Sequence, residues 1–214
     1  MGGDIGLEMK QVPKKLGREF YERDGLTVAR ELIGKVLVHE TKDGVIKGRI
    51  VESEAYMGEK DAAAHSYKKR SPNGRTNIQY GEGGHAYVYL IYGMYCCFNV
   101  VANGKDIPEC VLIRALEPVD GIETMKKNRK TDKEKNLCSG PGKLCQAMEI
   151  DRECYGKDLC GEVLYIEDWG EAVTKDMIER SPRINIDYAG EAAEYPWRFT
   201  KKDSPFLSVK KKKG

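Results

Sequence analysis

The chain has few of the side chains that usually hold metal ions in proteins. It contains only three histidines among its 214 residues, and its seven cysteines include no C-x-x-C pair. Zinc sites need thiolates or imidazoles at short spacing, and no histidine here stands close to a cysteine in that way. We therefore expect no structural metal and no cofactor. We expect the cysteines to be reduced thiols, several of them buried.

Long apolar segments are also absent. No run approaches the roughly 20 apolar residues that span a bilayer, and the first 15 residues have no apolar core of the kind found in a signal peptide. We expect an intracellular protein without a membrane partner. Internal repeats and low-complexity linkers are missing too, which favours a single domain at this length.

A strong net charge is absent as well, because 36 basic residues nearly balance 34 acidic ones and leave +2. The basic residues are unevenly distributed, however. Residues 125–143 carry seven Lys or Arg against two acids, and residues 198–214 carry seven against one. A third cluster of basic residues lies at 68–75. Each cluster alone fits a solvated surface, but the three together favour a nucleic-acid partner, whose phosphates release counterions on binding.

The segments that are present predict an α+β domain. The expected strands lie at 35–41, 45–56, 86–102, 110–117, 163–167, 183–187 and 198–201. The expected helices lie at 27–33, with Thr27 as a possible N-cap, at 119–129, and from a loop at 139 to about 150. A Lys-Asp-Gly turn joins the first two strands as a hairpin, and the polar, Gly-containing stretch 57–84 predicts a long functional loop. Regular βαβ alternation is lacking, which favours a largely antiparallel sheet over a doubly wound fold.

The segment 48–56, Gly-Arg-Ile-Val-Glu-Ser-Glu-Ala-Tyr, is the densest candidate for chemistry. Alternation along a strand places Glu52, Glu54 and Tyr56 on one face. Two carboxylates so close raise each other's pKa when buried, and paired carboxylates suit hydrolysis in which one deprotonates a water. The segment alone also fits an exposed edge strand with its polar side chains in solvent. His65, in the loop that follows, either reaches over the same face or is incidental.

Four tyrosines lie within nine residues at 87–95. Tyr87 and Tyr89 share a strand face, and Tyr92 directly precedes Gly93, where a turn or bulge would direct its ring away from the sheet. Aromatic faces stack on bases at about 1–3 kcal/mol each, and a ring that protrudes at a turn can wedge between base steps. The alternative is an aromatic strand that fills a core, which is the favoured interpretation for Tyr87 or Tyr89 taken singly.

Arg114 lies in the middle of the apolar strand expected at 110–117, where an unpaired charge would be costly to bury. It needs an anionic partner, and Glu54 or Glu52 is the natural one. Such a pair would keep the glutamate ionised, as a water-activating base requires. A purely structural ion pair is the alternative.

The segment 137–145, Leu-Cys-Ser-Gly-Pro-Gly-Lys-Leu-Cys, has the features of an anion site. Ser139 and Gly140 lie in a loop that enters a helix, and Lys143 falls in the first turn, where backbone N–H groups are free. The spacing does not match the loop that binds nucleoside triphosphates. We expect these residues to contact a backbone phosphate.

Taken together, these segments resemble the alkyladenine (3-methyladenine) DNA glycosylase family. The resembling motifs, in the family's order, are GRIVESEAY with GEKDAAAHS (48–66), AYVYLIYGMYCCFNV (86–100), CVLIRALEP (110–118), LCSGPGKLCQA (137–147) and RFTKKDSPFLS (198–208). The resemblance implies a catalytic domain over residues 16–208, with a tail at 1–15 and a basic tail at 209–214. It also implies a curved, largely antiparallel sheet with a protruding β-hairpin and surrounding helices.

The resemblance further implies an activity and residue roles. The protein would flip alkylated or deaminated purines out of duplex DNA and hydrolyse the N-glycosidic bond with an activated water, leaving an abasic site. Glu54 would activate that water, held by Arg114 and by a backbone carbonyl near Lys201. The other implied roles are pocket walls at Tyr56, His65 and Tyr89, a pocket floor at Asn99, and an intercalating wedge at Tyr92 with Met94. No lysine shares the strand face of Glu54, so we expect a hydrolase without a lyase step.

Lys201 departs from the family pattern, which has an apolar residue lining the pocket there. Its ammonium would disfavour a cationic base unless it points to solvent. The alternatives to this enzyme are a non-catalytic protein that binds damaged DNA, a glycosylase–lyase with a lysine nucleophile, and an RNA-binding protein. We expect a monomer that acts on double-stranded DNA with damaged purines, cytoplasmic and nucleoid-associated in a bacterium or nuclear in a eukaryote.

Overall fold

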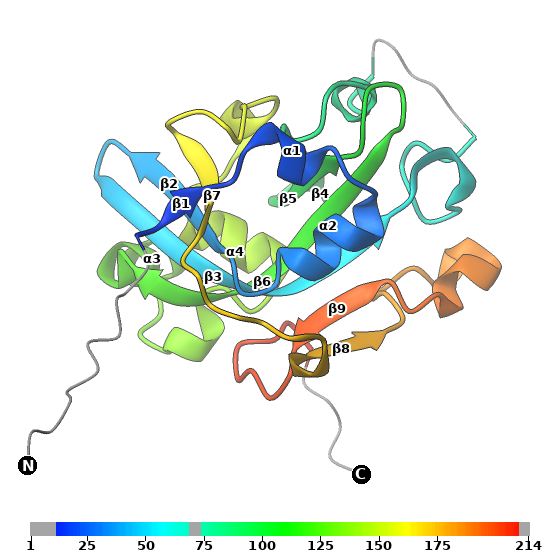
Figure 1. The fold of residues 1–214 in the computed structure, drawn as a ribbon. Helices are drawn as coiled ribbons and strands as arrows, with labels where there is room; N and C mark the ends of the chain where they lie inside the picture. The colour runs from blue at the N-terminus through cyan, green and yellow to red at the C-terminus, as the bar shows by residue number, and fades with distance from the viewer. Residues whose placement is uncertain (1–11, 69–73, 210–214) are drawn as a thin grey trace, which may run out of the picture.

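A computed structural model describes residues 12–68 and 74–209 of the chain, and all strand pairs in these residues are antiparallel. The strands are β1 (Lys14–Lys15), β2 (Val36–Thr41), β3 (Gly44–Tyr56), β4 (Ala86–Ile91), β5 (Tyr95–Ala102), β6 (Glu109–Asp120), β7 (Leu164–Asp168), β8 (Ile178–Ser181) and β9 (Arg198–Lys201). They form one sheet in the order β1-β7-β2-β3-β6-β5-β4, and β9 joins it beside β3 and carries β8 (Figure 1). The α+β prediction with a largely antiparallel sheet is confirmed.

Short helices surround this sheet. The α-helices are α1 (Arg18–Tyr21), α2 (Gly25–Glu31), α3 (Ile122–Arg129) and α4 (Pro141–Ala147). The 3₁₀ segments are η1 (Gly58–Lys60), η2 (Asn77–Tyr80), η3 (Glu134–Asn136), η4 (Arg152–Cys154), η5 (Lys175–Met177) and η6 (Asp187–Glu194). In Figure 1, α2 lies across the long strands β3 and β6. No helix of the described residues has the length and apolar character needed to cross a membrane.

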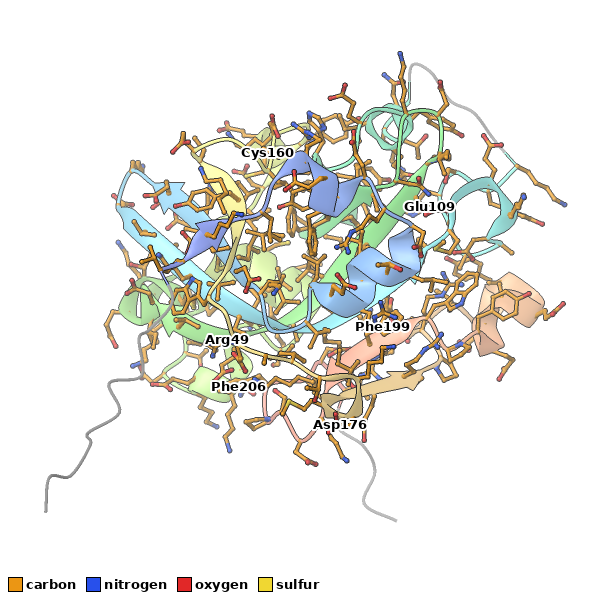
Figure 2. The ribbon with its side chains drawn as sticks, viewed as in Figure 1. Arg49, Glu109, Cys160, Asp176, Phe199 and Phe206 are labelled. Carbon is orange, nitrogen blue, oxygen red and sulfur yellow. The ribbon has the colours of Figure 1, made fainter. Side chains whose placement is uncertain are left out.

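The two faces of β4, β5 and β6 differ, because successive side chains of a strand point to opposite sides. The residues on one face belong to the main apolar core, together with residues of α1, α2 and α4: Ala86, Val88, Phe98, Val100, Val111 and Ile113. The other face is more polar and carries Tyr87, Tyr89, Asn99, Cys110 and Arg114. Phe199 of β9, labelled in Figure 2, is also part of the core. The polar face is where the candidate site forms.

Strand β3 is buried from residue 50 to residue 55. On one side, the Ser53 hydroxyl donates to the Ala29 carbonyl of α2 at 2.8 Å. β9 pairs with β3 at Glu52–Glu54, and the register between β3 and β6 shifts on either side of Glu52. Such bulges increase local twist and redirect side chains, and they are frequent beside active sites. Because β3 is covered on both sides, the interpretation of Glu52 and Glu54 as residues of an exposed edge strand is wrong.

Two helix boundaries differ from the prediction because of local contacts. The N-cap of α2 is Asp24, not Thr27, because the Asp24 carboxylate accepts the Thr27 N–H at 3.0 Å and starts the helix earlier. Residues 119 and 120 belong to β6 rather than to a helix. Asp120 pairs with Lys47 of β3, and Gly121 at φ +69° then ends the strand.

Two further segments differ for tertiary reasons. The helix expected to reach about 150 ends at Ala147, and Glu149 at φ +58° turns the chain away. The strand expected at 183–187 does not form, and the strand that pairs with β9 is β8, five residues earlier. Arg183 instead turns inward and forms a buried ion pair with Asp61.

Candidate active site

Glu52 and Glu54 of β3 and Arg114 of β6 form a buried charge cluster. Both carboxylates are fully buried, and Arg114 is 7% exposed. The Arg114 guanidinium donates from Nε to Glu52 Oε1 at 3.2 Å and from Nη1 to Glu54 Oε2 at 3.4 Å. The expected pairing of Arg114 with these glutamates is therefore present, and it joins both of them to one cation.

The two glutamates have different further partners. Glu52 also accepts from Arg198 Nε at 2.8 Å and from the backbone N–H and the hydroxyl of Ser208, both at 2.7 Å. Its oxygens are thus largely occupied by protein donors. Glu54 accepts from the Tyr56 hydroxyl at 2.9 Å and from the Ile184 N–H at 2.8 Å, so it has fewer cationic neighbours than Glu52.

The pKa of Glu54 is raised above its ordinary value, chiefly by burial. The charge of Glu52 also raises this pKa, whereas Arg114, the Ile184 N–H and the Tyr56 hydroxyl lower it. A carboxylate with a raised pKa is a stronger base than an exposed glutamate, and Arg114 favours its ionised form. Glu54 is therefore suited to accept a proton from a bound water.

A small cavity lies beside this cluster, on the polar face of the sheet. Its lining residues are Tyr56, Ala63, His65, Gln79, Tyr87, Tyr89, Asn99, Cys110 and Tyr188. The rings of His65 and Tyr89 meet edge to face at 4.6 Å, and those of Tyr87 and Tyr89 lie 5.3 Å apart. The structure thus brings together four of the five residues expected at a pocket, Tyr56, His65, Tyr89 and Asn99, and Lys201 is not among the lining residues.

His65 reaches the cavity from the loop that follows β3, and its Nδ1 lies 2.8 Å from the Tyr87 hydroxyl. Burial and, to a smaller extent, the charge of Arg75 together lower the pKa of His65 to about 4. The imidazole is therefore neutral under physiological conditions, and it offers a π face without a positive charge.

We expect His65 to titrate near pH 4 instead of near its ordinary value of 6.5. The unfolded chain then binds this proton more readily than the folded protein between these pH values, so the free energy of unfolding should fall as the pH drops from 6.5 toward 4. NMR titration of the ring protons, assigned by comparison with His65→Gln, measures the midpoint. A midpoint near 6.5 would mean that the ring is solvated and lies outside the cavity.

The β4–β5 hairpin ends in an exposed aromatic tip. Tyr92 and Gly93 have φ values of +52° and +69°, and the Met94 N–H donates to the Ile91 carbonyl at 3.2 Å. Positive φ at both central residues matches the tight type I′ turns of hairpins. Tyr92 is 82% exposed and Met94 72%. As the sequence predicted, the turn at Gly93 directs the Tyr92 ring away from the sheet.

The candidate phosphate site lies beside this hairpin. Lys143 is exposed in the first turn of α4, Ser139 is half-buried and Gly140 is buried. A Cβ added at Gly142 would lie 3.1 Å from Cβ of Tyr95, so the start of α4 packs closely against the hairpin. Of the expected basic clusters, residues 69–70 and the lysines at 210–213 lie outside the described residues.

The structure does not bring the Lys201 side chain into the cavity. Its ammonium donates to Glu171 Oε1 at 2.6 Å, and Glu171 also pairs with Arg49, which is labelled in Figure 2. The backbone of β9 nevertheless runs beside the carboxylates, because Thr200 pairs with Glu52. The Lys201 ammonium is thus paired with Glu171, which it shares with Arg49, while the backbone of β9 remains next to the site.

Several residues of the site were missed in the sequence. Arg183 and Asp61 form a fully buried ion pair, Ser208 and Arg198 hold Glu52, and Gln79 and Tyr188 line the cavity. Asp61 and Ser208 lie within the quoted motifs, but no local pattern distinguishes them from surface residues. The sequence does contain a signal for Arg183, because an arginine in a segment expected to be a strand needs an anionic partner when it is buried.

Comparison with known proteins identifies the family. Residues 19–205 match the family model of methylpurine-DNA glycosylase. The chain belongs to this family. The resemblance seen in the sequence is therefore confirmed, and the protein is a DNA glycosylase of DNA repair with DNA as its substrate.

The relatives of this glycosylase include bacterial and archaeal proteins, each named provisionally as a 3-methyladenine DNA glycosylase. A protein of Desulfitobacterium hafniense (strain Y51) is 50% identical over 206 residues, which cover 92% of this chain and all of the relative. One from Clostridium acetobutylicum is 51% identical, and the match covers 92% of this chain and 99% of the relative. One from Methanocella arvoryzae is 52% identical over 90% of this chain and 95% of its own.

Proposed function

We propose that this glycosylase flips alkylated or deaminated purines out of duplex DNA and hydrolyses their N-glycosidic bonds, leaving an abasic site. The observation that carries the proposal is the buried Glu54–Arg114 pair beside a cavity walled by aromatic rings. A protein that only bound damaged DNA would have no use for a buried carboxylate of raised pKa. The names of the relatives favour 3-methyladenine as one substrate.

Glu54 acts as the general base. Its carboxylate takes a proton from a water, the water oxygen forms a bond to the anomeric carbon of the sugar, and the electrons of the glycosidic bond leave with the base. Arg114 keeps Glu54 ionised, and together with a backbone carbonyl of β9 near Lys201 it positions the water. The donors of Tyr56 and Ile184 orient the carboxylate. No lysine acts as a nucleophile, so the base is released and the sugar stays in the uncleaved strand as an abasic site.

The cavity selects the base. A base inside a duplex is out of reach, and extrusion is least costly for a damaged or mispaired base. Tyr56, His65 and Tyr89 stack on the flipped purine, and Asn99 lies at the floor and crowds the exocyclic amine of guanine. A purine cationic through methylation is attracted by the π faces and is a good leaving group. Neutral bases such as hypoxanthine need hydrogen bonds in the cavity to leave.

The exposed hairpin and the start of α4 hold the DNA. Tyr92, with Met94, enters the duplex and occupies the space of the flipped nucleotide. Lys143, Ser139 and Gly140 contact a backbone phosphate beside it. The protein acts as a monomer on double-stranded DNA, at the nucleoid if the host is a bacterium. The catalytic domain extends over residues 16–208, between the two tails.

Tyr92→Ala should weaken binding to a duplex with one damaged base by about tenfold to a hundredfold, because the stacking of the ring is lost. Tyr92 is 82% exposed, so the free energy of unfolding should change by no more than about 0.5 kcal/mol. Tyr92→Phe is the matched control and should bind like the parent, since it keeps the ring. Fluorescence anisotropy with labelled duplexes measures the affinities. Unchanged affinity of Tyr92→Ala would exclude the wedge.

A duplex with one hypoxanthine tests the reaction type. The proposal expects free hypoxanthine and abasic sites in equal amounts, with strand breaks only after alkali treatment. Borohydride should trap no covalent complex between protein and DNA. A trapped complex would contradict the hydrolase mechanism and support a glycosylase–lyase with a lysine nucleophile. Binding of single strands or RNA in preference to duplex DNA would favour the RNA-binding alternative.

A further inference from the structure

Gln79 has a buried side-chain amide at the wall of the cavity. It lies in η2, where its backbone N–H donates to the Thr76 carbonyl at 3.0 Å, and only 1% of the residue is exposed. Among the described residues, neither Oε1 nor Nε2 of its side chain has a hydrogen-bond partner. The side chain lines the cavity together with Tyr87 and His65.

The neighbouring polar groups of the cavity are already engaged with each other. Tyr56 donates to Glu54, the Tyr87 hydroxyl is bonded to His65, and the Asn99 amide donates to the Tyr87 carbonyl at 3.1 Å. Burial raises the pKa of the Tyr87 hydroxyl, and the nearby Gln79 amide lowers it slightly. The geometry between the Gln79 amide and the Tyr87 hydroxyl is nevertheless not that of a hydrogen bond. Gln79 is thus a lining side chain whose amide oxygen and nitrogen, among the described residues, are both free for a ligand.

A buried amide without a partner destabilises a fold, and such groups are few in folded proteins. Functional sites are where such a cost is retained, because a ligand supplies the missing bonds. An amide presents one donor and one acceptor side by side, and glutamine pairs with adjacent donor and acceptor atoms of a purine.

We propose that Gln79 is a specificity-determining residue that donates one hydrogen bond to, and accepts one from, the polar edge of the flipped purine. The inference rests on the proposed function. Hypoxanthine offers N1–H as donor beside O6 as acceptor, and the amide of Gln79 can satisfy both. Ethenoadenine has one acceptor, N6, on that edge and no N–H, so it can make only one of the two bonds. The residue therefore favours purines with an adjacent donor and acceptor.

Gln79→Met tests this inference, because methionine keeps an unbranched side chain of similar length and removes the amide. Both the parent side chain and the variant are placed in a Glu54→Gln background, so that binding is measured without base release. Affinities are compared for duplexes with one hypoxanthine, one ethenoadenine or no lesion. We expect hypoxanthine affinity to fall about tenfold to a hundredfold and ethenoadenine affinity to fall at least several-fold less.

Gln146→Met is the matched control. Gln146 is exposed on α4, where its amide is bonded to Arg129 and to the Asn128 carbonyl. This control should leave the ratio of hypoxanthine to ethenoadenine affinity unchanged. Because Gln79→Met removes a buried amide without a partner, its thermal midpoint should equal or exceed that of the parent. If the methionine variant does not fold, Gln79→Leu takes its place in the same comparison.

An unchanged affinity ratio, or equal losses on both lesions with a lowered thermal midpoint, would overturn the role of Gln79 and make it a structural residue. This failure is distinct from failure of the proposed function. In the latter case, the protein with its native Gln79 would bind lesion duplexes no better than undamaged DNA and would release no base when Glu54 is intact.

Discussion

Glu54→Gln should reduce the rate of base release by about 10²- to 10⁴-fold, the usual contribution of a general base. The amide keeps the size of the side chain but cannot take a proton from water. Glu54 is buried beside Arg114 and the cavity, so a base from the solvent cannot reach the site and take over its role. Binding of damaged DNA should persist, because the aromatic walls and the hairpin are unchanged. Single-turnover assays and anisotropy measure the two properties separately.

Glu52→Gln is the matched control, since it removes the same charge from the same cluster. Glu52 is held by Arg114, Arg198 and Ser208, so its loss should lower stability more than the rate of the chemical step. If Glu52→Gln abolished base release in a folded protein and Glu54→Gln did not, the two glutamates would exchange roles.

The rate of base release by the parent should depend on pH through the ionisation of Glu54. Burial raises the pKa of Glu54 above its ordinary 4.5, and a general base must be deprotonated. The rate should therefore fall as the pH is lowered, with an acidic midpoint above 4.5. This limb should be absent from the residual activity of Glu54→Gln. An acidic midpoint below 4.5 would contradict the assignment.

Asp61→Asn should lower the free energy of unfolding by about 3–5 kcal/mol, because it leaves the Arg183 guanidinium buried without a counter-charge. Both side chains of the pair are fully buried. Arg183 donates from Nη2 to Asp61 Oδ1 at 2.8 Å and from Nη1 to the Ala55 carbonyl at 2.9 Å, and it stacks 4.7 Å from the centre of the Tyr56 ring. The pair thus connects the loop of His65 to β3.

The exposed pair between Lys126 and Glu123 provides the control for that loss. Glu123→Gln should change the free energy of unfolding by no more than about 1 kcal/mol, since solvent screens this pair. Equilibrium denaturation measures both variants. If Asp61→Asn lowered the free energy of unfolding no more than Glu123→Gln does, the buried ion pair between Asp61 and Arg183 would contribute little to the site. Because the Ile184 N–H that holds Glu54 follows Arg183 directly, Asp61→Asn should also slow base release.

The parts of the site that follow local rules could be predicted from the sequence. Strand alternation placed Glu52 and Glu54 on one face, the charge of Arg114 in an apolar strand required an anionic partner, and Gly93 indicated a turn that exposes Tyr92. The pairing of 35–41 with 45–56 follows from its hairpin signal in the same way. The strand expected at 86–102 is instead divided by the turn at Gly93 into β4 and β5, which pair with each other.

The remaining parts depend on contacts between distant segments. Arg183 and Asp61 are 122 positions apart, and Ser208 meets Glu52 across 156 positions. No periodicity marks such pairs. The failure of the strand expected at 183–187 has the same origin, because the buried ion pair of Arg183 outweighs local β propensity. Gln79 lies in a polar loop, and only the folded chain brings its amide into the cavity.

The central claim is that this chain hydrolyses the glycosidic bonds of damaged purines at Glu54. The most direct measurement is chromatography of the bases that the parent and Glu54→Gln release from methylated duplex DNA. We expect the parent to release 3-methyladenine and the variant to release almost none, although it binds the same DNA. Tight binding by the parent without release of any base would contradict the claim and make the protein a sensor of damaged DNA.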